Sequence, residues 1–198
     1  MTKQSRLFPQ NEPPVLTELA SQPATKLAQG IQSAVEAYCE RIEIAGSIRR
    51  QRPRVHDVDF VVLAKSDAHW QMISEVLKRL KAKPNCSGNR LIKAYVPHQG
   101  GLFQVDFYRA KPRTFGINLL VRTGSAEHNC WLAGQAISKS MRLKYSEGLI
   151  RDNQPIAGED ERGVFVALGL PFPLPEEREI VDSKPAWLPK QGNASSHS

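Results

Sequence analysis

Two short segments rich in β-branched and aromatic residues also contain aspartates, and they constrain the fold more than any other feature of the chain. Asp57–Ala64 reads Asp-Val-Asp-Phe-Val-Val-Leu-Ala, and Leu102–Tyr108 reads Leu-Phe-Gln-Val-Asp-Phe-Tyr. Both are predicted as buried strands. Because side chains alternate along a strand, Asp57 and Asp59 leave the same face of the first strand, and Asp106 leaves the polar face of the second. A buried, unpaired carboxylate is costly, so the fold must provide these side chains with a partner.

Hydrophobic periodicity predicts the elements around these two strands. Val15–Tyr38 and Trp70–Leu80 have apolar residues at helical spacing, Arg41–Ala45 alternates as a short strand, and Leu91–Val96 is a further strand. A turn at Pro97–Gly101 joins this strand to the second aspartate-bearing strand. The order helix, strand, strand, helix, strand, strand predicts an α+β layer with helices on one face of a small sheet.

The chain changes in character after Pro112. Ser125 is placed to cap a helix from Ala126 to Met141, a short irregular segment follows, and a last helix is predicted near Asp160–Leu168. Residues 1–14 are predicted to be a flexible lead-in. The Pro-, Gly-, Asn- and Ser-rich residues 184–198 are predicted to be a disordered tail.

The composition favours a polyanionic partner. The 198-residue chain has a net charge of +7 and a pI of about 9.5, and Lys or Arg near phosphates gain affinity by releasing condensed counterions. Its three cysteines, Cys39, Cys86 and Cys130, are far apart, which argues against a disulfide framework and a structural zinc site. The sequence has no apolar run of membrane-spanning length and no secretory signal. We therefore expect a cytoplasmic protein with no membrane partner.

The three aspartates indicate a metal site if the two strands that contain them are neighbours. Three carboxylates on one face repel one another unless cations neutralise them, and oxygen ligands suit Mg²⁺, with Mn²⁺ as a substitute. Two such ions about 4 Å apart would clamp both oxygens of an in-line phosphoryl displacement. The alternative is a set of surface aspartates that face water or pair with neighbouring arginines.

A glycine-serine turn precedes the first aspartate pair. Gly46-Ser47-Ile48-Arg49-Arg50 follows the strand predicted at Arg41–Ala45. Gly46 allows backbone N–H groups to approach a phosphate, Ser47 adds a hydroxyl donor, and Arg50 adds a multidentate cation. Gly-Ser alone is a common turn sequence. Together with the three aspartates, it predicts a nucleoside-triphosphate site that faces metal ions.

These motifs resemble those of the family X DNA polymerases, the DNA polymerase beta group. The similarity extends from about residue 15 to residue 180. The palm motifs also occur in other nucleotidyltransferases, whereas the thumb motifs are far more specific to this family. The similar stretches are Ala45–Arg50 and Asp57–Asp59 in the palm, Arg122–Asn129 at the start of the thumb, and Gly158–Asp160, Phe165–Pro171 and Pro175–Glu179 at its end.

The resemblance implies an α+β fold in two parts. Residues 15–112 would form a nucleotidyltransferase palm, a small mixed sheet with helices, and residues 113–183 a small α+β thumb. Because about 14 residues precede the palm, the chain is most similar to minimal palm-plus-thumb members. The implied activity is that of a DNA-directed DNA polymerase, which adds deoxynucleotides to a primer 3′ end by two-metal phosphoryl transfer and fills short gaps in DNA repair. The expected partners are primer–template or gapped DNA and deoxynucleoside triphosphates, and the expected state is a monomer.

The resemblance also assigns roles to individual residues. Asp57 and Asp59 would ligate both metal ions, and Asp106 would ligate the ion at the primer end. The nucleotide would be held by Gly46, Ser47 and Arg50 at its β and γ phosphates, by Thr123, Gly124 and Ser125 beneath its sugar, and by Asn129 at the minor-groove edge of its base. From their place after the thumb helix, Arg142 and Lys144 are expected to contact template phosphates.

Some positions depart from the family pattern. Val121-Arg122 stands where DNA polymerase beta has an aromatic pair near the sugar, so we expect weaker rejection of ribonucleotides. Gln104 stands where an arginine commonly flanks the third carboxylate. Two other functions stay open: a nucleotidyltransferase that copies no template or modifies a small acceptor, and a non-catalytic DNA-end-binding module. The intact aspartate set speaks against the second, since a site without metals has no use for carboxylates that repel one another.

Overall fold

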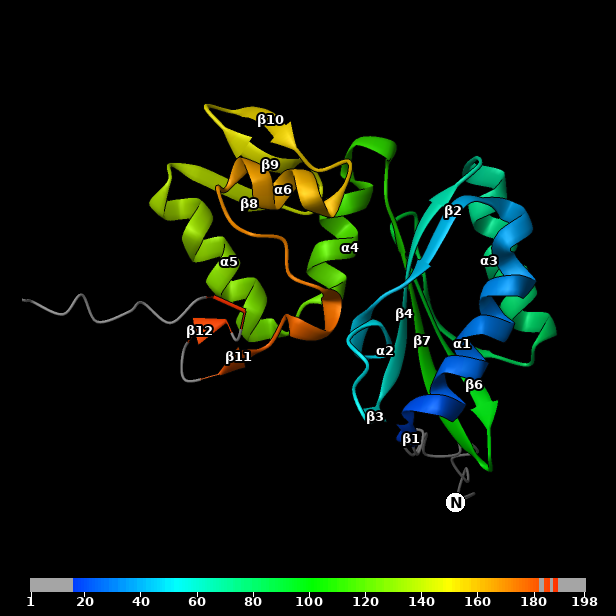
Figure 1. Cartoon of the computed structure of the whole chain (residues 1–198). Helices are drawn as coiled ribbons and strands as arrows, with labels where there is room; N and C mark the ends of the chain where they lie inside the picture. Colours follow the sequence, from blue (N-terminus) through cyan, green and yellow to red (C-terminus); the bar gives the residue numbers. More distant parts are fainter. Residues whose placement is uncertain (1–15, 182–183, 186, 189–198) are drawn as a thin grey trace, which may run out of the picture.

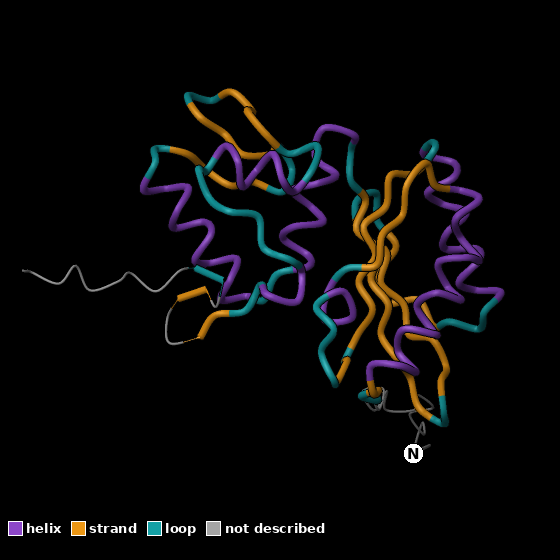
Figure 2. The backbone as a smooth tube through the Cα atoms, viewed as in Figure 1, coloured by secondary structure: helices purple, strands orange, loops and turns teal. Residues whose placement is uncertain are grey.

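The structure, a computed structural model that describes residues 16–181, 184–185 and 187–188, consists of two lobes (Figure 1). The first, the palm lobe, is built on a five-stranded sheet, and the second, the thumb lobe, combines helices with a three-stranded sheet. Figure 2 shows the strands of the palm lobe side by side, with its long helices on one side of them. This is the α+β class that the sequence predicts. The predicted lead-in, residues 1–14, lies outside the described residues.

The palm sheet is mixed, and its strands lie in the order β2-β4-β7-β6-β5. The two central strands β4 and β7 are parallel neighbours, and the other neighbouring pairs are antiparallel. The strands are β2 (Cys39–Ile44), β4 (Asp57–Ala64), β5 (Lys83–Ser87), β6 (Leu91–His98) and β7 (Gly101–Arg109). The two aspartate-bearing strands are therefore adjacent, which is the condition on which the predicted carboxylate cluster depends.

Two amphipathic helices, α1 (Ser21–Val35) and α3 (Asp67–Arg79), cover one face of this sheet (Figure 1). Each buries an apolar stripe at helical spacing. The stripes are Ala24, Ala28, Ile31 and Val35 in α1, and Trp70, Ile73, Val76 and Leu77 in α3. The sheet contributes Phe60 and Phe107, whose rings stack with centroids 4.6 Å apart. This packing directs the alternate residues of β4 and β7, including the aspartates, to the opposite face.

Short elements surround the start of β4. The helix predicted over residues 15–38 begins only at Ser21, because β1 (Leu19–Ala20) pairs with β3 (Arg54–Val55). A 3₁₀ turn, η1 (Glu36–Tyr38), follows α1, and a single helical turn, α2 (Gly46–Arg49), follows β2.

Helix α4 (Phe115–Thr123), after the 3₁₀ turn η2 (Pro112–Thr114), connects the two lobes. Phe115 and Leu119 pack against the palm sheet at Val61. Other residues of the same helix, such as Leu120, belong to the thumb core. Because α4 contacts both lobes, it fixes the thumb over the face of the sheet that bears the aspartates. The sequence pattern did not predict this helix.

The thumb lobe contains α5, α6 and an antiparallel sheet in the order β10-β9-β8. Its elements are α5 (Ala126–Ser138), β8 (Met141–Lys144), β9 (Gly148–Arg151), β10 (Gln154–Ala157), α6 (Glu161–Ala167) and the 3₁₀ turn η3 (Pro175–Glu177). The segment predicted to be irregular is therefore a small sheet. Asp152 and Asn153 take positive φ angles of 50° and 60°, and this tight turn brings β9 and β10 together. No helix in the described residues is long and apolar enough to cross a membrane.

The predicted disordered tail requires a correction at its start. β11 (Ile180–Val181) pairs with β12 (Lys184–Pro185). The Trp187 ring packs against the thumb, with centroids 5.5 Å from Trp131 and 6.0 Å from Phe165. Burying a large aromatic ring is favourable, so this part of the predicted tail is anchored to the thumb core. Residue 186 and residues 189–198 lie outside the described residues.

Candidate active site

The three carboxylates leave the thumb-facing side of the palm sheet. In the parallel register of β4 and β7, Asp59 lies directly beside Asp106, and Asp57 lies beside Gln104. Asp106 is 1% exposed, and Asp57 and Asp59 are partly buried. The structure thus brings the three predicted metal ligands together on two central strands.

The electrostatics of this cluster disfavour its charged state. Burial, and then the charges of Asp57 and Asp106, raise the pKa of Asp59 to about 7. Burial, and then the charge of Asp106, also raise the pKa of Asp57. Because the charged forms of Asp57 and Asp59 are disfavoured, a cation bound between them would stabilise these charged forms.

Asp106 already has neighbours that donate to both of its oxygens. The Lys93 ammonium lies 2.6 Å from Oδ2, and the Tyr108 hydroxyl donates to the same oxygen over 3.0 Å. Gln104 Nε2 donates to Oδ1 over 3.1 Å. Burial lowers the pKa of Lys93, but the hydrogen bond and the charge of Asp106 outweigh this and raise it, so Lys93 is cationic.

The donor set fits hard divalent cations. All of its ligands are carboxylate oxygens, the atoms that Mg²⁺ and Mn²⁺ prefer, and a bound cation would favour the ionised forms that burial disfavours at Asp57 and Asp59. In the part of the chain that the structure describes, no three His, Cys, Asp or Glu side chains are yet gathered closely enough to hold one ion. Asp106 would first have to exchange its present partners for a metal.

The glycine-serine turn lies directly beside this cluster. Gly46 has a φ of +61°, and a Cβ at this position would collide with the Asp59 carboxylate. The Oγ of Ser47 is buried and has no hydrogen-bond partner in the described residues. A buried hydroxyl without a partner is costly, so this atom is suited to meet a polar ligand such as a phosphate oxygen.

Arg50 and Asn129 are engaged elsewhere. Arg50 Nε donates to Glu179 Oε1 over 2.8 Å, and its Nη1 donates to the Thr123 carbonyl over 2.6 Å. Asn129 Nδ2 donates to the Val121 carbonyl over 2.7 Å. Both residues lie at the junction of palm and thumb, and each would have to change partners to contact a nucleotide.

The Thr123-Gly124-Ser125 segment forms the junction between α4 and α5. Ser125 caps α5, as predicted, because its Oγ accepts a hydrogen bond from the His128 N–H over 3.1 Å. Thr123 Oγ1 accepts from Arg49 Nη1 over 2.8 Å. Gly124 packs closely, since a Cβ there would lie 2.6 Å from Asn129 Oδ1. The segment is thus held to the palm at α2 by Arg49 and Arg50.

A buried ion-pair network, which the sequence did not predict, ties the thumb to α2. Arg49 donates to both oxygens of Glu161 over 2.8 and 2.6 Å, and Arg178 donates to one of them over 2.5 Å. Burial raises the pKa of Glu161, but the hydrogen bond from Arg49 and the charge of Arg178 lower it overall. The network joins residues 112 and 17 positions apart, so no local pattern indicates it.

Arg122 faces the carboxylates from the thumb side. Its guanidinium lies 3.7 Å above the centre of the Tyr108 ring, and its Nε is buried with no hydrogen-bond partner in the described residues. The charge of Arg122 lowers the pKa of Asp59, against the larger effect of burial. Arg122 thus links the thumb to the residue that donates to Asp106.

A positively charged cleft of about 880 Å³ extends from Tyr108 and Arg122 along the ends of β4 and β7. Its basic lining residues are Lys65, Arg90, Arg109, Lys111 and Arg122, against Glu40 and Asp67. The two predicted DNA contacts lie on β8, where Arg142 donates to Asn153 and Lys144 pairs with Glu147.

We expect the free energy of unfolding of the metal-free protein to depend on pH through the raised pKa of Asp59. Its unfolded-state pKa is near 4 and its folded-state pKa about 7, so a charged Asp59 costs folded-state stability as the pH rises through this window. The free energy of unfolding of Asp59→Asn, relative to that of the wild type, should therefore be higher at pH 8 than at pH 5 by at least about 1 kcal/mol, since one pKa unit corresponds to ~1.4 kcal/mol.

This difference is measured by urea unfolding of both proteins in EDTA at the two pH values. Because His128 is present in both, its own titration cancels. Asp67→Asn is the control for the loss of a carboxylate outside the cluster, since the Asp67 side chain is 94% exposed and pairs with Arg109. A constant difference between Asp59→Asn and the wild type would contradict the expectation.

A second expectation concerns Gly46. Gly46→Ala should reduce the free energy of unfolding by at least about 2 kcal/mol, because the left-handed backbone disfavours a side chain and the new methyl group collides with Asp59. Gly30→Ala is a matched control within α1, where a Cβ meets nothing within 4 Å. That exchange should stabilise the protein by about 0.5–1 kcal/mol. Equal effects in thermal or urea unfolding would contradict the assignment.

The chain is similar to known polymerases in sequence. Residues 118–179 match the family model of the DNA polymerase beta thumb. DNA polymerase/3′-5′ exonuclease PolX of Bacillus subtilis is 26% identical over 164 residues, which are 79% of this chain and 28% of that protein. DNA polymerase IV of Saccharomyces cerevisiae is 34% identical over 77 residues, which are 39% of this chain and 13% of that protein. The chain thus spans less than a third of the length of these two relatives.

The fold is also similar to a solved structure. The ternary P/T complex of polymerase beta from Leishmania infantum matches with a TM-score of 0.71 at 20% identity. The match covers 83% of this chain and 77% of that chain. At this identity the similarity establishes the fold, a palm sheet followed by a thumb.

Proposed function

We propose that this chain, a relative of the family X DNA polymerases, is a DNA-directed DNA polymerase that adds deoxynucleotides to a primer 3′ end. The observation that most supports the activity is the parallel register of β4 and β7, which sets Asp106 beside Asp59 on the face toward the thumb. Filling of short gaps in DNA repair is the biological role that we propose for it. We further propose that it acts as a cytoplasmic monomer.

The carboxylates would hold two Mg²⁺ ions, or Mn²⁺ in their place. Asp57 and Asp59 would ligate both ions, and Asp106 the ion at the primer end. The ions, when bound, would supply positive charge that stabilises the phosphoryl oxygens in the transition state. The chain's own contribution is to keep these carboxylates on two rigid, adjacent strands, partly buried from water.

The nucleotide would lie between the glycine-serine turn and the thumb. Gly46 leaves room beside Asp59, and the Ser47 hydroxyl, which has no hydrogen-bond partner among the described residues, would donate to a phosphate oxygen. Arg50 would exchange Glu179 for the triphosphate, since a guanidinium binds phosphate oxygens with several donors. The remaining contacts would come from Thr123, Gly124 and Ser125 beneath the sugar and Asn129 at the base.

DNA would be bound through its phosphates. The cleft contains five basic side chains against two acidic ones, and Arg142 and Lys144 offer further cations on the thumb. Such contacts make affinity fall steeply with salt. Because phosphate contacts do not depend on sequence, we expect little preference for one DNA sequence over another.

The function is tested by extension of a labelled primer that borders a one-nucleotide gap, with Mg²⁺ and deoxynucleotides. A product longer by one nucleotide, absent in EDTA, is expected. The same primer as a single strand should be extended far less. Equal extension of the single strand would instead indicate a nucleotidyltransferase that copies no template, and binding of gapped DNA without any extension in Mg²⁺ or Mn²⁺ would indicate a non-catalytic DNA-end-binding module.

A further inference from the structure

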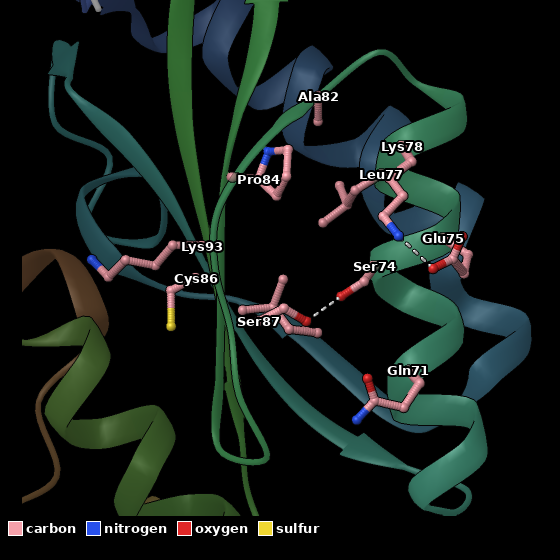
Figure 3. A pocket seen from close by; sticks show the side chains of 12 residues that line it. Gln71, Ser74, Glu75, Leu77, Lys78, Ala82, Pro84, Cys86, Ser87 and Lys93 are labelled. Atoms are coloured by element: carbon pink, nitrogen blue, oxygen red, sulfur yellow. Dashed lines mark hydrogen bonds and ion pairs between the residues drawn. The ribbon is translucent and has the colours of Figure 1, made fainter. Parts of the chain in front are cut away.

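Lys93 is a charged residue of the site to which the family resemblance assigns no role. It lies near the middle of β6, directly opposite Asp106 in the antiparallel register of β6 and β7. A small pocket of about 160 Å³ lies between α3 and β5–β6, and Lys93 is one of its lining residues. Figure 3 shows the Lys93 side chain pointing away from α3. Its side chain therefore leaves the sheet on the face of the aspartates.

The Lys93 ammonium lies where a metal ion bound to Asp106 would lie. Its Nζ lies 2.6 Å from Asp106 Oδ2, and the side chain is 30% exposed. Among the ion pairs of the described residues, this is the one that involves Asp57, Asp59 or Asp106 directly. Arg122 is nearby, but its guanidinium stacks on Tyr108.

A metal ion at Asp106 and the Lys93 ammonium would compete for the same oxygen. Oδ2 is the atom that Lys93 and Tyr108 both contact, and Gln104 contacts Oδ1. Like charges repel at short range, so an ammonium that stays beside Asp106 weakens the binding of a divalent ion there. The same ammonium also holds the carboxylate in place while no metal is bound.

We propose that Lys93 is a positioning residue that holds Asp106 in the metal-free protein and raises the metal concentration at which the primer-side ion binds. The inference rests on the proposed function, because it assumes that Asp57, Asp59 and Asp106 are metal ligands. Lys93 leaves Oδ2 when the ion arrives, and the cluster gains the charge of the ion in place of that of the ammonium. Removal of the ammonium therefore makes the empty site more attractive to metal.

The test is Mn²⁺ binding to the full chain without DNA or nucleotide, measured by calorimetry and by the electron paramagnetic resonance of free Mn²⁺. Lys93→Met should bind Mn²⁺ about tenfold more tightly than the wild type. Lys93→Gln should show the same direction, and Lys93→Arg should resemble the wild type. Lys78→Met is the matched control: Lys78 lies on α3, pairs with Glu75, and loses the same charge far from the aspartates.

The expected result includes the loss of the Lys93 effect when Asp106 is changed. In an Asp106→Asn background, Lys93→Met should alter Mn²⁺ affinity by less than about twofold, because the shared oxygen is no longer anionic. Unchanged or weaker binding by both Lys93→Met and Lys93→Gln, or an equal gain in Lys78→Met, would overturn the inference. If Asp57→Asn then still abolished Mn²⁺ binding, the metal site of the proposed function would stand, whereas an absence of Mn²⁺ binding in the wild type would remove both.

Discussion

Asp57→Asn and Asp106→Asn are each expected to reduce nucleotide incorporation by roughly 10³-fold or more, because each removes a carboxylate from the proposed metal site. The effect should be in kcat at saturating nucleotide, since the ions stabilise charge that develops in the transition state. Single-turnover incorporation on a gapped duplex measures it. Glu75→Gln is the control, because this carboxylate pairs with Lys78 on α3, on the other face of the sheet and outside the basic cleft, and it should retain near wild-type activity.

Loss of activity in these variants should not come from loss of the fold. The charges of Asp57 and Asp106 repel each other, so Asp57→Asn should leave the unfolding free energy unchanged or higher in EDTA. Asp106→Asn also weakens the ion pair with Lys93, so its folded state is checked separately by urea unfolding. Binding of gapped DNA without nucleotide should also persist through the basic cleft. Wild-type-like incorporation by Asp106→Asn would contradict the assignment of this residue.

Glu161→Gln is expected to destabilise the protein by about 3–5 kcal/mol, the largest stability effect that the structure indicates. Arg178 has a fully buried side chain, and its ion pair in the described residues is with Glu161. Removing the carboxylate leaves this guanidinium buried without a counter-charge and also releases Arg49 from the thumb. The measurement is the urea midpoint with an unchanged m-value.

Two further variants distinguish the stability contribution of the buried ion-pair network from that of an exposed ion pair. Glu147→Gln removes an exposed ion pair with Lys144 and should change stability by less than about 0.5 kcal/mol. Glu161→Met combined with Arg178→Met should recover part of the loss, because it leaves no fully buried charge unpaired, whereas Arg49, which also loses its partner, is partly exposed. A loss below about 1 kcal/mol in Glu161→Gln would show that the network contributes little.

The sequence predicted those helices and strands in which the spacing of apolar residues matches the face that is buried. β4 and β7 alternate apolar and polar residues because one face packs on helices and the other faces the site. Helix α4 was missed since seven of its nine residues are buried, which leaves no polar stripe at helical spacing. Strand β5 was missed for the opposite reason: all five residues are exposed, and Pro84 interrupts the strand pattern.

The sequence predicted those features of the site that depend on residues close together in the chain. The aspartate pair shares a face because its members are two residues apart, and Ser125 caps a helix because it directly precedes one. The pairing of Lys93 with Asp106 follows from the hairpin register and could have been found from the predicted turn at Pro97–Gly101. The Glu161–Arg178 pair could not, since it depends on how the thumb folds back on itself.

The central claim, synthesis directed by a template, is tested most directly by kcat/KM for each deoxynucleotide opposite each of the four template bases. The substrate is a one-nucleotide gap with Mg²⁺. The account predicts that the complementary nucleotide is preferred at every template base, by at least roughly tenfold, because in the proposed function the thumb would contact the new base pair rather than the free base. Incorporation of the same nucleotide whatever the template base, or no incorporation at all, would contradict it.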